Sequence, residues 1–129
     1  MKDPVTVLLF VESRYKVNRK RIKQAVKNVL GDQQMTQQVE VSVAIVGDRK
    51  MRELSKKYKG EDKTRNILSF SLTEGGQVVV PSDALRLGDI VISFPEVIRE
   101  ASKDEVFVDD RIDELVTHGM MHLLGLHHE

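Results

Sequence analysis

The sequence predicts an α+β fold, a mixed four-stranded sheet with helices packed against it and a central, histidine-bearing C-terminal helix. Two observations predict it. Apolar residues alternate in some segments and recur at helical spacing in others, in the order β-α-β-α-β-β-α-α. No repeat, low-complexity linker or shift in composition divides the 129 residues, so we expect residues 1–129 to form a single domain.

Four segments have the composition of β-strands. The clearest is Val39–Val46, in which β-branched residues alternate along the chain. The apolar run Val5–Val11 is far too short to span a bilayer and is not a signal peptide, so we interpret it as a strand and expect no membrane association. The predicted strands are Val5–Val11, Val39–Val46, Ile67–Leu72 and Ile90–Ser93, and Thr73–Leu85 suits a hairpin-like excursion.

Four other segments have helical periodicity. Asp48 and one of Asp109 or Asp110 are suitable N-caps, and Pro95 suits the first turn of a helix. In the second helix we expect Tyr58 to face the core, like Met51 and Leu54. The predicted helices are Lys16–Val29, Arg49–Tyr58, Glu96–Ala101, and a last one that begins at Asp109 or Asp110.

The last helix is expected to be largely buried, because an apolar stripe runs along it. Gly119 belongs to this stripe, although glycine costs roughly 1 kcal/mol in a helix interior relative to alanine. We therefore expect a neighbouring strand to approach closely there. The stripe comprises Ile112, Leu115, Val116, Gly119, Met120 and Leu123.

The formal net charge is zero, but the charge is unevenly distributed. Residues 1–65 carry sixteen Lys and Arg against eight Asp and Glu, whereas residues 66–129 carry four against twelve. Such asymmetry indicates either a basic surface for a polyanion or two halves that neutralise each other in the fold. The chain has no cysteine, which excludes disulfides, thiolate metal sites and a cysteine nucleophile, and fits a reducing, cytoplasmic compartment.

Residues 118–128 contain all of the chain's histidines, in the string H-x-x-x-H-x-x-G-x-x-H. His118 and His122 lie four residues apart, so a helix projects both imidazoles from one face. Gly125 suits the helix exit, after which His128 can supply a third nitrogen. Three imidazoles with an open fourth position are typical of catalytic zinc, which lowers the pKa of a water to about 7 and favours hydrolysis. An i, i+4 pair without metal, or the remnant of a purification tag, is the plainer interpretation.

The same string has the spacing of the metzincin peptidases, H-E-x-x-H-x-x-G-x-x-H, except at one position. Gly119 stands where those enzymes carry the glutamate that acts as general base. Loss of that base would cost orders of magnitude in peptide hydrolysis. A peptidase is therefore a weaker hypothesis than another metal-dependent hydrolase.

The chain resembles the YbeY endoribonucleases over most of its length. Their signature H-G-x-x-H-L-x-G-x-D-H is similar to residues 118–128, Y-R-G-x-D-x-x-T-D-V-L-S-F to residues 58–70, and L-G-D-I-x-I-S to residues 87–93. The resemblance implies one Zn²⁺ per chain bound by His118, His122 and His128. It further implies cleavage of single-stranded RNA, a role in small-subunit ribosomal RNA maturation and ribosome quality control, and contact with the ribosome or small-subunit proteins.

Several residues outside the histidine string are candidates for further roles. Lys59 and Ser69 are the candidate catalytic residues, and Lys63 and Arg65 could bind substrate phosphates. Ser69 is equally well explained as a buried serine bonded to backbone. Asp89 is a candidate for orienting a ligand histidine, or else a plain turn residue. Tyr58 and Phe70 are expected to be core residues rather than platforms for base stacking.

Four departures from the family pattern weaken the catalytic assignment more than the metal site. Lys59 replaces an arginine, which keeps the charge but loses the bidentate grip on phosphate. Asn66 and His127 stand where the family has aspartates, so His127 is either a second-shell residue or an alternative third ligand. The last residue of the sequence is Glu129. It is a candidate proton acceptor or extra metal ligand, or else part of a disordered end. A zinc-binding ribosome accessory protein with little catalysis therefore remains an alternative.

Overall fold

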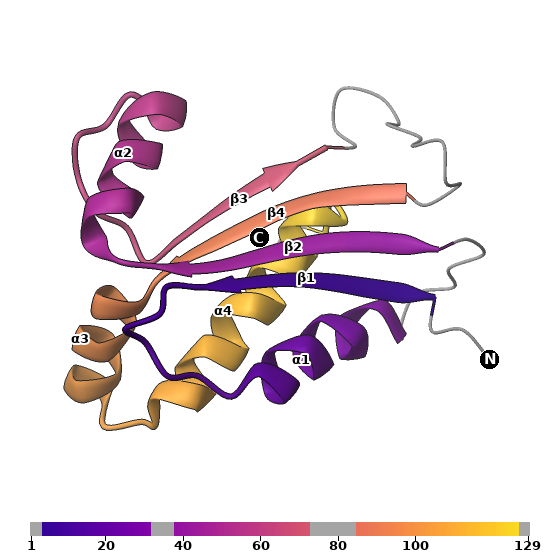
Figure 1. Cartoon of the computed structure of the whole chain (residues 1–129), viewed down its shortest axis with the longest axis horizontal. Coiled ribbons are helices and arrows are strands. Elements are labelled where there is room, and N and C mark those ends of the chain that lie inside the picture. Colours follow the sequence, from indigo (N-terminus) through magenta and orange to yellow (C-terminus); the bar gives the residue numbers. More distant parts are fainter. Residues whose placement is uncertain (1–3, 32–37, 73–84, 127–129) are drawn as a thin grey trace.

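The structure is a computed structural model that describes residues 4–31, 38–72 and 85–126, and its elements follow the predicted order (Figure 1). The predicted excursion Thr73–Leu85 lies, except for Leu85, outside the described residues. None of the described helices is long and apolar enough to cross a membrane. The elements are β1 (Val5–Val11), α1 (Arg19–Gly31), β2 (Val39–Val46), α2 (Asp48–Lys59), β3 (Ile67–Ser71), β4 (Leu85–Ser93), α3 (Phe94–Asp104) and α4 (Val108–Leu123).

The four described strands form one mixed sheet in the order β1-β2-β4-β3. Strands β1, β2 and β4 are parallel, and β3 runs antiparallel to β4 at the end of the sheet. The register aligns Leu8 with Ser42, Ser42 with Asp89, and Asp89 with Phe70, so these four residues form a row across the sheet. This confirms the predicted α+β class with a mixed four-stranded sheet.

The two faces of the sheet are covered unequally. Helices α1, α3 and α4 lie on one face and α2 on the other (Figure 1). The larger core lies on the three-helix face, where Val41, Val43 and Ile45 of β2 pack with Ile90 and Ile92 of β4. A smaller cluster beneath α2 holds four buried residues, Val46, Met51, Leu68 and Val91. The α2 face of the sheet is therefore only partly covered.

Helix α4 packs on the sheet as predicted, because all six residues of its apolar stripe are buried. A Cβ atom on Gly119 would lie 3.1 Å from Cδ1 of Ile90 and 3.2 Å from Cδ1 of Ile67. The expectation of a close strand at Gly119 is therefore confirmed. The predicted N-cap was wrong: the cap is Phe107, whose side chain accepts no capping hydrogen bond. Asp110 instead pairs with Arg21 of α1, as does Asp113.

Two further predictions were wrong for tertiary reasons. Tyr58 is 53% exposed, although Met51 on the same helix is fully buried, because Tyr58, near the end of α2, packs against Phe70 at its edge and is otherwise left uncovered. Strand β4 begins at Leu85, well before Ile90, because Gly88 continues the strand through an irregularity in register rather than ending a turn. Gly88 has φ +149°, a conformation that favours glycine, and a Cβ there would overlap the Phe70 carbonyl.

Asp48 is the first residue of α2 rather than its N-cap, which is Gly47. Its carboxylate accepts hydrogen bonds from the hydroxyls of Thr64 and Ser93, both at 3.0 Å, and from the Arg99 guanidinium at 3.0 Å. Burial raises the pKa of Asp48, but the bonds from Arg99, Thr64 and Ser93 outweigh it and hold that pKa below its usual range. The carboxylate thus joins α2, the loop before β3, the end of β4 and α3.

We predict that Asp48→Asn lowers the free energy of unfolding by about 1–2 kcal/mol at pH 7, because the charge-assisted bond to Arg99 is lost. A depressed pKa stabilises the fold above the unfolded-state pKa, about 3.9, and this contribution disappears as pH falls through the folded-state pKa. The difference between wild type and variant should therefore shrink below about pH 4, measured by urea unfolding.

Asp62→Asn is the matched control for this experiment. Asp62 is exposed and forms only a surface ion pair with Arg52 at 3.4 Å, so we expect a change below about 1 kcal/mol. Equal losses for the two variants, or a loss for Asp48→Asn that does not change with pH, would contradict the role given to Asp48.

Candidate functional site

His118 and His122 bring their rings together on the exposed side of α4. Their Nε2 atoms are 3.2 Å apart, and the ring centroids are 4.7 Å apart with a tilt of 52°. Both side chains are exposed, while Gly119 between them is buried against the strands. The buried stripe of α4 therefore holds the two imidazoles at one edge of the helix, facing solvent.

The separation of 3.2 Å has two chemical interpretations. One neutral imidazole can donate from Nε2 to the other, depending on its tautomer. Alternatively, two nitrogens bonded to one zinc at about 2.0–2.1 Å in tetrahedral geometry are about 3.3 Å apart. The pair thus has the spacing of two ligands to one ion. Within the described ranges, no group of three His, Cys, Asp or Glu is placed to hold a metal.

The predicted third ligand lies at the C-terminal end of the chain. His128, His127 and Glu129 are outside the described residues, so their roles stay predictions. The chain leaves the helix as expected, since α4 ends at Leu123 and Gly125 has φ +74°. The Gly125 amide donates to the His122 carbonyl at 3.0 Å, which closes the helix immediately after the second histidine.

Ser69 lies on the same face of the sheet as the histidine-bearing helix. Two residues before it on β3, the side chain of Ile67 packs against α4 at Gly119, and Ser69 itself pairs in register with the buried Ile90. At the other end of β3, Ser71 pairs with Gly88 of β4, which packs against the Leu123 side chain of α4. The half-buried Ser69 therefore lies between two contacts of β3 and β4 with the last turns of α4.

Lys59, Lys63 and Arg65 gather around a single carboxylate. Lys63 pairs with Glu61 at 3.1 Å and Arg65 pairs with it at 3.7 Å. The hydrogen bond from Lys63, with the positive charges of Arg65 and Lys59, lowers the pKa of Glu61. Lys59 is the last residue of α2, which lies on the face of the sheet opposite α4, the helix that carries the histidine pair (Figure 1).

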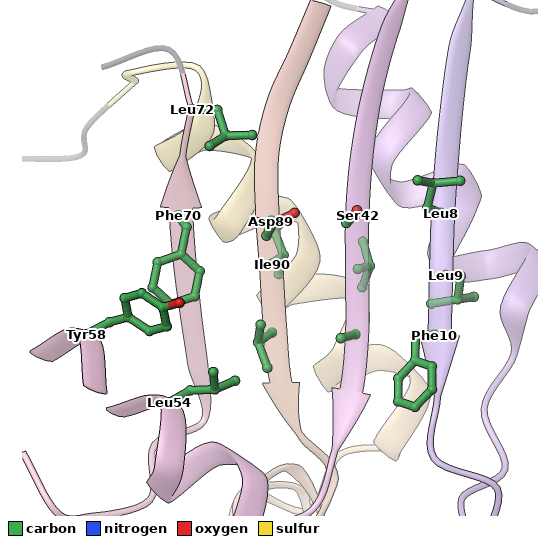
Figure 2. Close-up of a pocket in the computed structure, with 13 residues that line it drawn as sticks. Leu8, Leu9, Phe10, Ser42, Leu54, Tyr58, Phe70, Leu72, Asp89 and Ile90 are labelled. Carbon is green, nitrogen blue, oxygen red and sulfur yellow. The ribbon is translucent and has the colours of Figure 1, made fainter. Parts of the chain in front are cut away.

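Asp89 lies on the face of the sheet away from α4. Its neighbour Ile90 points into the α4 core, and alternation along β4 turns Asp89 to the opposite side. There it lines a groove of about 640 Å³, whose walls and floor come from all four strands and α2 (Figure 2). The expected role of Asp89, orienting a ligand histidine, does not fit this placement.

The groove is the feature that the sequence prediction missed. Strand β1 carried a signal for it, because residues on both of its faces are apolar. Val5, Val7 and Leu9 pack against the core, but Leu8 and Phe10 are 48% and 60% exposed. A strand with two apolar faces indicates either a second packed layer or an exposed apolar site.

Comparison with known proteins places these features in a family. Residues 10–129 match the family described as Endoribonuclease YbeY. The chain is 34% identical over 118 residues to the Endoribonuclease YbeY of Syntrophus aciditrophicus, across 92% of this chain and 72% of that protein. It is 31% identical over 120 residues to that of Acinetobacter baumannii, across 93% and 76%. The match to that of an Anaeromyxobacter species, 38% over 90 residues, spans only 44% of that longer protein.

A solved structure has the same fold. The solution structure of a Thermotoga maritima protein superposes with a TM-score of 0.63 over 96% of this chain and 75% of that one. The two sequences are 23% identical, so the likeness concerns the fold alone.

We predict that Gly125→Ala lowers the free energy of unfolding by about 1 kcal/mol, because alanine is strained at φ +74° while no atom of the described residues lies within 4 Å of the added Cβ. Gly31→Ala, at the end of α1 and equally uncrowded, is the control and should be neutral or slightly stabilising. Urea unfolding measures both. Equal destabilisation by the two substitutions would show that the left-handed exit at Gly125 is not the cause.

Proposed function

This chain belongs to the endoribonuclease YbeY family, and we propose that it cleaves single-stranded RNA at a zinc ion held by His118, His122 and His128. The observation that carries the proposal is the 3.2 Å separation of the Nε2 atoms of His118 and His122. That spacing supports a shared ion, because it is close to the separation of two nitrogen ligands on tetrahedral zinc.

The chemistry of the donor set fits zinc. Neutral imidazole nitrogens are common zinc ligands, and three of them leave a position open for a reacting group. When bound, the ion would supply Lewis-acid polarisation of a phosphoryl oxygen and activation of water. His118 and His122 would each bond through Nε2, which the fold already turns toward a common point. His128 would complete the set after the helix exit at Gly125.

Other residues would bind and orient the RNA. Ser69, on the strand that packs along the last turns of α4, would donate a hydrogen bond from its hydroxyl to the substrate near the histidine pair. Lys59, Lys63 and Arg65 surround one carboxylate and so retain a net positive charge that attracts phosphates. Because these cations lie by α2, we assign them to binding RNA at a distance from the bond that is cleaved.

The biological role we propose is maturation of small-subunit ribosomal RNA and ribosome quality control in the cytoplasm. It follows the family assignment and requires contact with the ribosome or with small-subunit proteins. The accessory-protein alternative shares the metal and the RNA, and it differs only in lacking cleavage. The assay of RNA cleavage below therefore separates the two.

The packing of Gly119 argues against a peptidase. In the metzincin string this position carries a catalytic glutamate, but here it points between Ile67 and Ile90, in the core. A carboxylate at this point would be buried away from the solvent-facing edge where the two imidazoles converge. Position 119 in this fold is therefore unsuitable for the general base of a metzincin, because a side chain there would face the core.

We predict that the purified, untagged protein binds about one equivalent of zinc, and that His122→Ala weakens binding at least 100-fold because one of three ligands is lost. Protons compete for imidazole nitrogens, so binding should also weaken on acidification. Competition with a chromogenic chelator measures the affinity. Thr117→Ala, exposed on the same helix, is the control and should bind like wild type. Unchanged affinity in His122→Ala would remove the proposed metal site.

We predict that zinc-loaded protein cleaves single-stranded ribosomal RNA, and that a chelator or His122→Ala reduces the rate by orders of magnitude. Because His122 is exposed, the variant should keep the wild-type urea midpoint, which separates loss of chemistry from loss of fold. Gel analysis of end-labelled RNA measures cleavage, with casein as the control substrate. If wild type and variant leave RNA equally intact, the nuclease proposal fails; zinc-dependent casein cleavage would favour the peptidase.

A further inference from the structure

A groove on the α2 face of the sheet is not used by the proposed metal site. It lies across the open part of the sheet, and its floor is low because small residues, Ser42 and Ala44, occupy the centre of β2 (Figure 2). Leu8 and Phe10 of β1 form one wall. Leu54, Tyr58, Phe70 and Leu72 form the other. Its volume of about 640 Å³ is within the range of pockets that take drug-sized ligands, which are larger than a single nucleobase.

Large apolar side chains are exposed in this groove. Leu8, Phe10 and Tyr58 are 48%, 60% and 53% exposed, and they come from two elements on opposite sides of the floor. Isolated exposed apolar residues are ordinary, but a group that lines one concavity marks a binding surface. The groove is therefore a candidate site for a ligand with apolar or aromatic faces.

The Tyr58 ring is held at one wall of the groove and stays about half exposed. Tyr58 meets Phe70 edge to face, with centroids 4.9 Å apart and planes at 61°. The contact fixes the tyrosine against the wall while half of its surface remains exposed. Phe10 faces it from the other wall (Figure 2). Rings held in this way suit stacking with unstacked nucleic-acid bases, which every base permits through its π-face.

The rim of the groove is positively charged. The Lys57 ammonium lies 5.2 Å from the centroid of the Tyr58 ring. Lys57 is exposed, and across residues 4–31, 38–72 and 85–126 it forms no ion pair. A cation beside an aromatic wall suits an RNA strand whose bases enter the groove while its phosphates stay at the rim.

The floor of the groove carries two hydrogen-bonding side chains, a carboxylate and a hydroxyl. Asp89 aligns in register with Ser42, and both line the groove. A carboxylate is an acceptor only, so it pairs best with a base that offers an exocyclic amino group, as adenine, cytosine and guanine do. Uracil has no amino group, and its one donor, N3–H, lies between two carbonyl oxygens that repel a carboxylate. Asp89 would therefore make the groove selective among bases.

We propose that this groove binds bases of the single-stranded RNA substrate, as a second contact site on the face of the sheet opposite the histidine pair. The inference rests on the proposed nuclease function and adds to it. Tyr58 and Phe10 stack bases, Asp89 with Ser42 accepts hydrogen bonds from their amino groups, and Lys57 contacts a phosphate at the rim. RNA bound at both sites passes around β3, the end strand of the described sheet.

Binding is tested separately from cleavage, with full-length His122→Ala protein as the background. Fluorescence anisotropy measures its affinity for oligo(A), oligo(C) and oligo(U) of about twelve nucleotides. We expect Tyr58→Ala and Phe10→Ala to weaken binding about tenfold or more, the loss of one stacked base. We also expect oligo(A) and oligo(C) to bind more tightly than oligo(U), and Asp89→Asn to remove that preference. Phe107→Ala, at a residue 79% exposed beside α4 and away from the groove, is the matched control.

Each outcome decides the proposal. The proposal is overturned if the Tyr58→Ala and Phe10→Ala proteins bind RNA as tightly as the Phe107→Ala control. It is also overturned if the groove binds apolar peptides while these substitutions leave RNA binding unchanged. In the His122-containing enzyme, groove substitutions should raise KM for long RNA and leave kcat unchanged. If wild type binds RNA through the groove but cleaves none, the nuclease function fails and the groove proposal stands. All substituted aromatic residues are exposed, and circular dichroism checks that each variant is folded.

Discussion

The close packing of α4 against β3 and β4 at Gly119 fixes the rest of the site. Because residue 119 has no side chain, the side chains of Ile67 and Ile90 approach the helix so closely that an added Cβ would be crowded. This contact sets the rotation of α4 about its own axis. Residues one position before and three positions after Gly119 then fall at the exposed edge, where the two imidazoles converge. The geometry of the histidine pair is thus a consequence of core packing.

The second constraint is the unequal covering of the sheet. Three helices bury one face, and α2 shields only part of the other. The buried cluster beneath α2 reaches only as far as Leu68 and Val91. A helix of twelve residues cannot cover four strands, so the far side of the face, at Leu8 and Phe10, stays open. The same topology that places the histidines on one face leaves a groove on the other. The two surfaces are therefore products of a single arrangement of elements.

Sequence reasoning succeeded where the signal was local. The order of elements, the buried stripe of α4, the exit at Gly125 and the mixed sheet all follow from periodicity and from the conformational freedom of glycine. It failed where the answer depended on residues distant in the chain. Asp48 has the chemistry of an N-cap, but Arg99 and Ser93 lie too far along the sequence to reveal its actual partners. The side of the sheet that Asp89 faces depends likewise on strand pairing, which the sequence does not show.

The charge asymmetry illustrates how two open interpretations can each hold in a different part of the fold. Between α1 and α4 the halves neutralise each other, since Arg21 pairs with Asp110 and Asp113. On α2 the basic residues exceed their acidic partners, and Lys56 and Lys57 are left without ion pairs among the described residues. Net charge of a segment therefore did not locate the basic surface. Which cations remain available to a polyanion depends on the ion pairs that each one forms in the fold, as the paired Arg21 and the exposed Lys57 illustrate.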